Sequence, residues 1–193
     1  VRNYTNRFVY VSLSGKIESL TIDDCIFIGA DNSTTNKAIY ASSAHTQVET
    51  LSVTNSTFLN FNTGSNYFFR INCGEELVLM PVVLIDHCTF YNCYDRRGVY
   101  LYNAGRSTIK NCISAFSERR DDTKSFTAYG DESIVKNVIS YNVDLYGSAP
   151  KENIISKNPL FVDAENGNFQ LYKDSPAVGA GDDGSDLGDP RWG

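Results

Sequence analysis

A phrase of strand-forming residues that returns five times constrains the fold of this chain more than any other feature. Each copy alternates apolar and polar residues, bends at a short polar residue and then alternates again. The copies occupy residues 20–27, 51–58, 83–90, 107–114 and 133–140. Their third residues fall at 22, 53, 85, 109 and 135, so the period is 24 to 32 residues. Such a period is typical of a solenoid, in which each unit buries its apolar face against its neighbours.

A second run, rich in β-branched and aromatic residues, precedes each copy of the phrase. These runs occupy residues 8–12, 38–42, 68–72, 99–103 and 126–130 and end in Ser, Asn or Gly. Both features are typical of strands. Each coil should therefore hold a first strand, a second strand, a tight corner, a third strand and a long loop. We predict an all-β chain, with a right-handed, single-stranded parallel β-helix of about five coils over residues 1–157.

The corner between the second and third strands carries a short polar side chain in every coil. The equivalent residues are Asp24, Asn55, His87, Asn111 and Asn137. Such side chains hydrogen-bond the backbone of a bend, and Asn tolerates a left-handed backbone. The pattern predicts a polar ladder along the stack, with His87 as a structural member. His45 is the only other histidine, so neither a histidine-based triad nor a zinc site is expected.

The residue after the corner indicates how the cysteines are used. This position holds Cys25, Ser56, Cys88, Cys112 and Val138 in successive coils. A site that accepts these three residue types is small and faces inward, where free Cys packs well. The sequence therefore predicts a stack of buried thiols. Cys73 and Cys93 lie outside this stack, and they could pair only if their loops approach each other.

Residues 158–193 break the repeat and end in a segment rich in Gly and Asp. Solenoids need an atypical terminal unit that covers the last exposed face. We therefore predict a C-terminal cap of the same domain over residues 158–193. The chain begins at Val1 without an initiator Met. An excised segment, with further coils once preceding it, is expected.

The charge balance narrows the classes of partner. The net charge is −6 at neutral pH, which argues against nucleic acid as a ligand. A local basic groove on an acidic protein could still bind an acidic polymer. No stretch approaches the roughly 20 apolar residues that span a bilayer, so no transmembrane segment is expected. We expect a monomer.

The closing segment resembles a known family. Residues 158–163, 168–171 and 175–181 resemble a segment common in secreted bacterial right-handed parallel β-helix proteins of the pectate-lyase-like superfamily. The ending, residues 187–192, resembles the C-terminal region of surface proteins with which gut bacteria use polysaccharides. The resemblance implies an extracellular, cell-surface or periplasmic location. It also implies that an acidic polysaccharide binds along the first strands, walled by the loops that precede them.

Candidate binding residues follow from that expectation. Arginine forks match carboxylate or sulfate geometry, and tyrosine rings stack on sugar faces. The candidates are Arg70, Arg96, Arg97, Arg119, Arg120, Tyr40, Tyr100 and Tyr102. Alternation places Tyr100 and Tyr102 on one face and Tyr40 with Arg70 on the other, and it leaves open which face points outward. In the alternative interpretation, residues 117–122 form a self-paired charge cluster and Arg70 pairs with Glu75 or Glu76.

Three functions remain open at this point. The chain could bind an acidic polysaccharide without cleaving it, or it could serve as a structural adhesin or spacer. It could also be a pectate- or uronate-type lyase that works by β-elimination, with Arg70, Arg97 or Arg120 as base. No cofactor is required, although Ca²⁺ held by Asp121 and Asp122 could neutralise a uronate. The pair Asp182-Asp183 resembles the carboxylates of polygalacturonase-type hydrolases, but the Gly-His-Gly and Arg-x-Lys motifs of those enzymes are absent.

Overall fold

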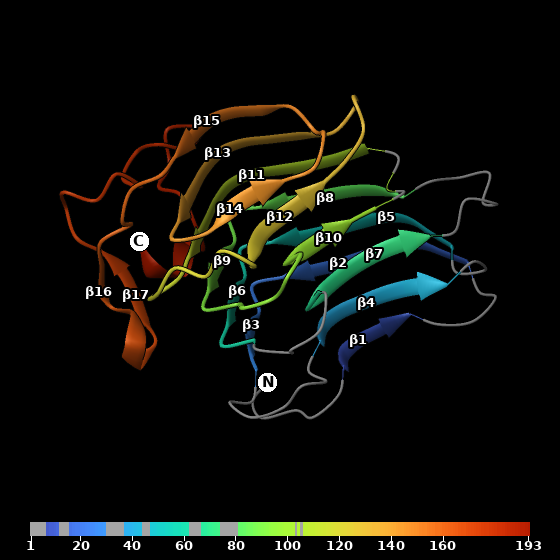
Figure 1. Cartoon of the computed structure of the whole chain (residues 1–193), viewed down its shortest axis with the longest axis horizontal. Coiled ribbons are helices and arrows are strands. Elements are labelled where there is room, and N and C mark those ends of the chain that lie inside the picture. Colours follow the sequence, from blue (N-terminus) through green and yellow to red (C-terminus); the bar gives the residue numbers. More distant parts are fainter. Residues whose placement is uncertain are drawn as a thin grey trace.

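Parallel β-strands make up nearly all the regular structure of the chain. The computed structural model describes residues 7–11, 16–29, 37–43, 47–61, 67–73, 81–102, 104 and 106–193. One sheet, here named the first sheet, contains six strands that stack in chain order (Figure 1). They are β1 (Arg7–Val11), β4 (Lys37–Ser43), β7 (Phe69–Cys73), β10 (Val99–Leu101), β12 (Lys124–Ala128) and β14 (Asp144–Tyr146).

A larger sheet, here named the second sheet, contains the other strands of the coils. Its second strands are β2 (Lys16–Asp23), β5 (Gln47–Thr54), β8 (Val82–Asp86), β11 (Arg106–Ala115), β13 (Ile134–Tyr141) and β15 (Lys151–Ile155). Its short third strands are β3 (Ile26–Ile28), β6 (Thr57–Leu59) and β9 (Thr89–Tyr91). The first half of β11 pairs with β8 and the second half pairs with β9, all in parallel. The predicted parallel β-helix is confirmed, and the first sheet has one strand more than the about five coils expected.

The predicted corners adopt the left-handed backbone that the sequence indicated. The five corner residues have φ values between 48° and 53°. Asn153 on β15, opposite Asn137, continues this column with φ 50°. Three other Asn residues, each just after a strand, also have positive φ. They are Asn60, Asn92 and Asn142. The coil therefore bends at two columns of residues that tolerate this conformation.

The interior of the coils is a stack of aromatic rings and thiols. Phe27, Phe58 and Phe90 lie face to face, with centroids 4.9 and 5.0 Å apart. Cys88 and Cys112 are fully buried and free, as predicted, and desolvation raises the pKa of the Cys88 thiol. Cys93 is also buried and free, whereas the side chain of Cys73 lies outside the described residues.

The C-terminal segment packs along the flank of the coils. It forms an antiparallel hairpin of β16 (Phe161–Asp163) and β17 (Asn168–Leu171), with a 3₁₀ turn η1 (Ala164–Asn166) between them. Residues 181–193, here named the strap, then run back along the stack and end in η2 (Pro190–Trp192). Figure 1 shows this segment beside the sheets, at the left of the view.

The strap packs against the outward side of the third strands. β15, the last strand of the stack, leaves Lys151, Glu152 and Asn153 exposed. The strap instead covers the outward side of the third strands, where Thr89 and Ile113 are buried. It approaches so closely that a Cβ on Gly188 would lie 2.7 Å from Thr89 Oγ1, and the φ of this glycine is +91°. The buried outer face of the third strands, rather than the end of the stack, is what this segment covers.

No helix within the described ranges is long and apolar enough to cross a membrane.

Candidate functional site

Residues of the first sheet align in columns because its strands pair in register. Tyr10 pairs with Tyr40, Tyr40 with Arg70, and Arg70 with Tyr100. The prediction that Tyr40 and Arg70 face away from Tyr100 was therefore wrong. Val99 pairs with Phe69 rather than Phe68, and a slip of one residue moves a strand's side chains to the opposite face.

Seven tyrosines form a continuous row along the outside of the first sheet, here named the tyrosine stripe. Its members, in order along the stack, are Tyr10, Tyr40, Tyr67, Tyr100, Tyr102, Tyr129 and Tyr146. The centroids of successive rings lie 5.6 to 6.5 Å apart. Tyr10 and Tyr146 are exposed, while Tyr100 is buried beneath its neighbours and forms the floor of the row. Burial raises the pKa of Tyr67 and of Tyr129, which keeps their hydroxyls neutral.

Cationic side chains lie over these rings. The Arg70 guanidinium carbon is 4.4 Å from the Tyr67 centroid, and Arg70 donates a hydrogen bond to the Tyr67 hydroxyl. The Arg97 guanidinium carbon is 4.7 Å from the Tyr100 centroid, and Lys37 Nζ is 4.9 Å from that of Tyr67. Such cation–π contacts orient a cationic side chain without neutralising its charge, as an ion pair with a carboxylate would.

The two stripe arginines keep their charge available. No carboxylate among the described residues forms an ion pair with Arg70 or Arg97. The Arg70 Nε is buried without a hydrogen-bond partner there. Glu75 and Glu76, the alternative partners of Arg70, lie outside the described residues. The stripe is therefore an aromatic surface with localised positive charge on an acidic protein.

A hollow of about 360 Å³ opens at the end of the stripe. Its lining consists of Arg96, Arg97, Asp122, Lys124 and Tyr146. Three cations and one carboxylate give it a positive balance, although Lys124 Nζ also lies 3.4 Å from Asp144. The hollow can accept an anionic group beside the ring of Tyr146.

Two predicted arginines do not join the stripe. Arg119 pairs with Asp121 at 3.0 Å and with Asp144 at 3.0 Å, as the self-paired alternative describes. Arg120 lies over the Tyr94 ring, at 3.8 Å from its centroid. In the part of the chain that the structure describes, no group of three His, Cys, Asp or Glu side chains could hold a metal ion, and this includes the surroundings of Asp121 and Asp122.

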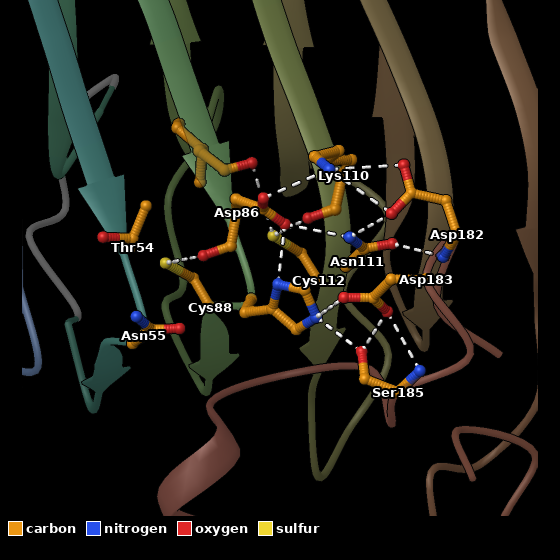
Figure 2. Close-up of polar contacts among 12 residues, drawn as sticks. Thr54, Asn55, Asp86, Cys88, Lys110, Asn111, Cys112, Asp182, Asp183 and Ser185 are labelled. Carbon is orange, nitrogen blue, oxygen red and sulfur yellow. Dashed lines mark hydrogen bonds and ion pairs between the residues drawn. The ribbon is translucent and has the colours of Figure 1, made fainter. Parts of the chain in front are cut away.

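A second polar cluster joins the strap to the coils. Asp182 accepts from Asn111 Nδ2 at 2.9 Å and pairs with Lys110 at 3.2 Å (Figure 2). It also pairs with Lys136 at 3.0 Å. The bonds from Asn111 and the two lysines hold its pKa well below its usual range. Asn111 Nδ2 also donates to Asp86 at 3.0 Å. The polar ladder therefore consists of amide–carboxylate bonds here, and it anchors the strap.

His87 takes part in this junction, which the sequence argument did not foresee. Its Nδ1 lies 2.8 Å from Asp86 Oδ1 and its Nε2 lies 2.8 Å from Ser185 Oγ. The corner position predicted a structural role for His87, and no histidine-based triad was expected because His45 is the only other histidine. Ser185 is 98 residues away, in a Gly- and Asp-rich segment, and no sequence pattern links the two.

Comparison with known proteins identifies a family. No curated protein matches the chain. A family model described as "Domain of unknown function (DUF5123)" matches residues 83–192, which is more than half of the chain. The matched region runs from β8 to the strap, and so includes His87, Arg97 and Ser185. The chain therefore belongs to the DUF5123 family.

Proposed function

We propose that this protein binds an acidic polysaccharide along the tyrosine stripe. The observation that carries the proposal is the row of rings with Arg70 and Arg97 held over it, neither of them paired with a described carboxylate. A uronate residue presents an apolar C–H face and a carboxylate. Tyrosine rings complement the face, and guanidinium groups complement the carboxylate in a bidentate fashion.

The shape of the site favours a polymer over a single sugar. The stripe is long and runs the length of the first sheet, and successive strands add successive rings. When sugar residues are linked in one chain, binding of the first raises the effective concentration of the next. Several weak contacts then give a higher overall affinity. The positive hollow beside Tyr146 would accept one carboxylate or sulfate at the end of the row. We therefore infer a ligand of several linked uronate or sulfated residues.

The family resemblance of residues 158–181 supports the same inference. In pectate-lyase-like proteins the polymer lies along the first strands, which here carry the stripe. We propose an extracellular location, at the cell surface or in the periplasm of a bacterium, and a monomeric protein. Binding by rings and guanidinium groups requires no cofactor, and Ca²⁺ could add to it by bridging carboxylates.

Cleavage is less well supported than binding. A lyase needs a base that removes a proton next to the carboxylate. Guanidinium groups stay protonated in proteins, and the pKa values of Tyr67 and Tyr129 are raised. The described groups of the stripe thus include no ready base. We propose a binding module in preference to a lyase with Arg70, Arg97 or Arg120 as base.

Affinity electrophoresis tests the proposal. Gels should contain polygalacturonate, alginate, chondroitin sulfate or heparin, with neutral dextran as the control. We expect retardation by at least one acidic glycan and none by dextran, and weaker retardation at about 0.2 M salt because screening weakens ionic contacts. Arg97→Ala should weaken binding by about 10- to 150-fold, since a charged hydrogen bond contributes roughly 1.5–3 kcal/mol.

Arg119→Ala is the matched control, because Arg119 is already paired with Asp121 and Asp144. It should bind like the wild type. No retardation by any acidic glycan, or equal losses in Arg97→Ala and Arg119→Ala, would contradict the proposal. Ultraviolet absorbance of an unsaturated uronate product in the same incubations would show instead that the protein is a lyase.

A further inference from the structure

Three polar side chains meet in sequence at the strap junction: an Asp86–His87 ion-pair contact is followed by a His87–Ser185 hydrogen bond. Asp86 Oδ1 lies 2.8 Å from His87 Nδ1, and His87 Nε2 lies 2.8 Å from Ser185 Oγ (Figure 2). In serine hydrolases the carboxylate holds the imidazole tautomer, and the imidazole accepts the serine proton. The atoms meet here in the same order.

The fold holds each member of this chain in place. His87 occupies the left-handed corner after β8, with φ 49°. Asp86, the last residue of β8, is fixed by Asn111 Nδ2 at 3.0 Å and by Lys110 at 3.3 Å. Ser185 lies on the strap, where its carbonyl accepts from the Gly181 backbone N–H at 2.8 Å. The arrangement thus rests on two separate parts of the chain that the Asp182 ion pairs tie together.

A cavity opens beside the Ser185 hydroxyl. It has a volume of about 360 Å³, and both His87 and Ser185 line it. Most of its remaining lining is apolar and includes Ile113, Phe161 and Trp192. Three carboxylates of the strap, Asp183, Asp186 and Asp189, also line it. The cavity therefore suits an uncharged apolar group and repels an anionic one.

We propose that Ser185 is the nucleophile of an esterase site, with His87 as its base and Asp86 as its positioning residue. The substrate class is an ester of a small, uncharged, apolar acid. Ser185 Oγ would attack the ester carbonyl carbon while its proton passes to His87 Nε2. The C–O bond to the alcohol then breaks, and the same proton leaves with the alcohol. Water repeats these steps on the acyl-serine and releases the acid.

Asp183 competes for the Ser185 proton but makes a poorer base. Ser185 Oγ also lies 2.5 Å from Asp183 Oδ1. Hydrogen bonds from the Ser185 hydroxyl and backbone lower the Asp183 pKa. A carboxylate with a lowered pKa is a weaker base than an ordinary carboxylate, and the Nε2 of His87 lies 2.8 Å from the same hydroxyl. His87 is therefore the group that accepts the proton.

A backbone donor next to Ser185 could serve the developing oxyanion. The backbone N–H of Asp186, the residue after Ser185, has no hydrogen-bond acceptor among the described residues. Asn55 also lines the cavity, and one proton of its amide goes to Asp23 Oδ1 at 2.9 Å. This site is separate from the tyrosine stripe, so the two proposals stand independently.

The test combines a fluorophosphonate probe with p-nitrophenyl butyrate, on the full chain. We expect probe labelling of Ser185, located by peptide mass, and measurable ester hydrolysis. Ser185→Ala and His87→Gln should each lower hydrolysis by about 100-fold or more, in line with the loss of a nucleophile or its base. Asp86→Asn should lower kcat at an unchanged KM.

Ser117→Ala is the matched control, since Ser117 is an exposed serine whose hydroxyl lies 3.0 Å from that of Tyr94. It should hydrolyse the ester like the wild type. Fluorescence of Trp192, the single tryptophan, reports for each variant whether the strap stays docked. If the docked wild type is neither labelled nor faster than docked Ser185→Ala, the proposal is wrong and Ser185 only ties the strap to the coil.

Discussion

Single residues at the corners carry a backbone conformation that most amino acids avoid. Asn111 has φ 51°, is fully buried, and donates from one amide to both Asp86 and Asp182. A residue with a Cβ and no such polar group pays about 1–2 kcal/mol to adopt this conformation. The same residue therefore shapes the coil and anchors the strap.

Substitution of Asn111 should separate these two roles. Asn111→Ala should lower the free energy of unfolding by about 2–4 kcal/mol, because it adds backbone strain to the loss of buried hydrogen bonds. Asn111→Gly should lose less, since glycine adopts positive φ freely. Urea unfolding of the two variants measures the difference. Equal losses in both would show that the backbone conformation contributes nothing.

The sequence predicted these corners well, but it did not predict the contact of His87 with Ser185. Asp, Asn and His recur there at a fixed place in the repeat, and their preference for left-handed φ is a local property. The contact of His87 with Ser185 is not local, because it depends on where the strap crosses the corner. Pairs of this kind cannot be derived from a repeat alone.

At the scale of strands, register decides which side chains reach the surface. The stacked rings of Phe27, Phe58 and Phe90 fill the coil from one strand to the next. Their alternation was readable because each third strand has the same length and the same corner before it. The first strands follow loops of differing length. The alignment of β7 with β10 expected from the sequence was therefore wrong by one residue, and Tyr40 was placed on the wrong face.

The phenylalanine stack should be the most sensitive part of the interior. Phe58 is fully buried and lies between two other rings. Phe58→Ala should therefore lower the free energy of unfolding by about 3–5 kcal/mol. Phe58→Leu should lose less, because it leaves a smaller cavity. Tyr172→Ala, at a residue that is 54% exposed, is the control and should change stability by less than about 0.5 kcal/mol.

Denaturant titration, monitored by circular dichroism, measures these losses in the free energy of unfolding. A Phe58→Ala variant as stable as Tyr172→Ala would mean that the rings do not support the stack.

At the scale of the whole molecule, the strap joins coils that are far apart along the stack. Asp182 binds Lys136 on β13, Gly188 N donates to Asn111 O, and Arg191 reaches Asp24 at the first corner. The composition of the tail predicted an atypical terminal unit but not its docking site. The docking site is the outward-facing column of Thr57, Thr89, Ile113 and Ile139, which is buried. The two isoleucines of this column could have indicated the site, because apolar side chains on an outer face are usually covered by another segment.

The strap should loosen in acid, and Asp182 should be a main cause. Bonds from Asn111 and the lysines lower its pKa from the ordinary 3.8, so the folded state binds fewer protons than the unfolded state. Its stabilisation is therefore complete above about pH 4 and is lost as the pH falls through the lowered folded value. Burial raises the pKa of Asp189, which therefore acts in the opposite sense.

Asp182→Asn isolates the contribution of the Asp182 charge to strap docking. The fluorescence of Trp192 reports docking, because the indole Nε1 of Trp192 donates to Thr57 Oγ1 at 2.8 Å in the docked strap. At neutral pH, Asp182→Asn should undock at a lower urea concentration than the wild type. The difference should shrink as the pH falls from about 4 towards 2, because the unfolded chain takes up a proton there that the folded Asp182 carboxyl does not. Asp174→Asn, at an exposed carboxyl of the same C-terminal segment, should match the wild type throughout. A difference that persists unchanged in acid would mean that Asp182 acts through packing rather than through its charge.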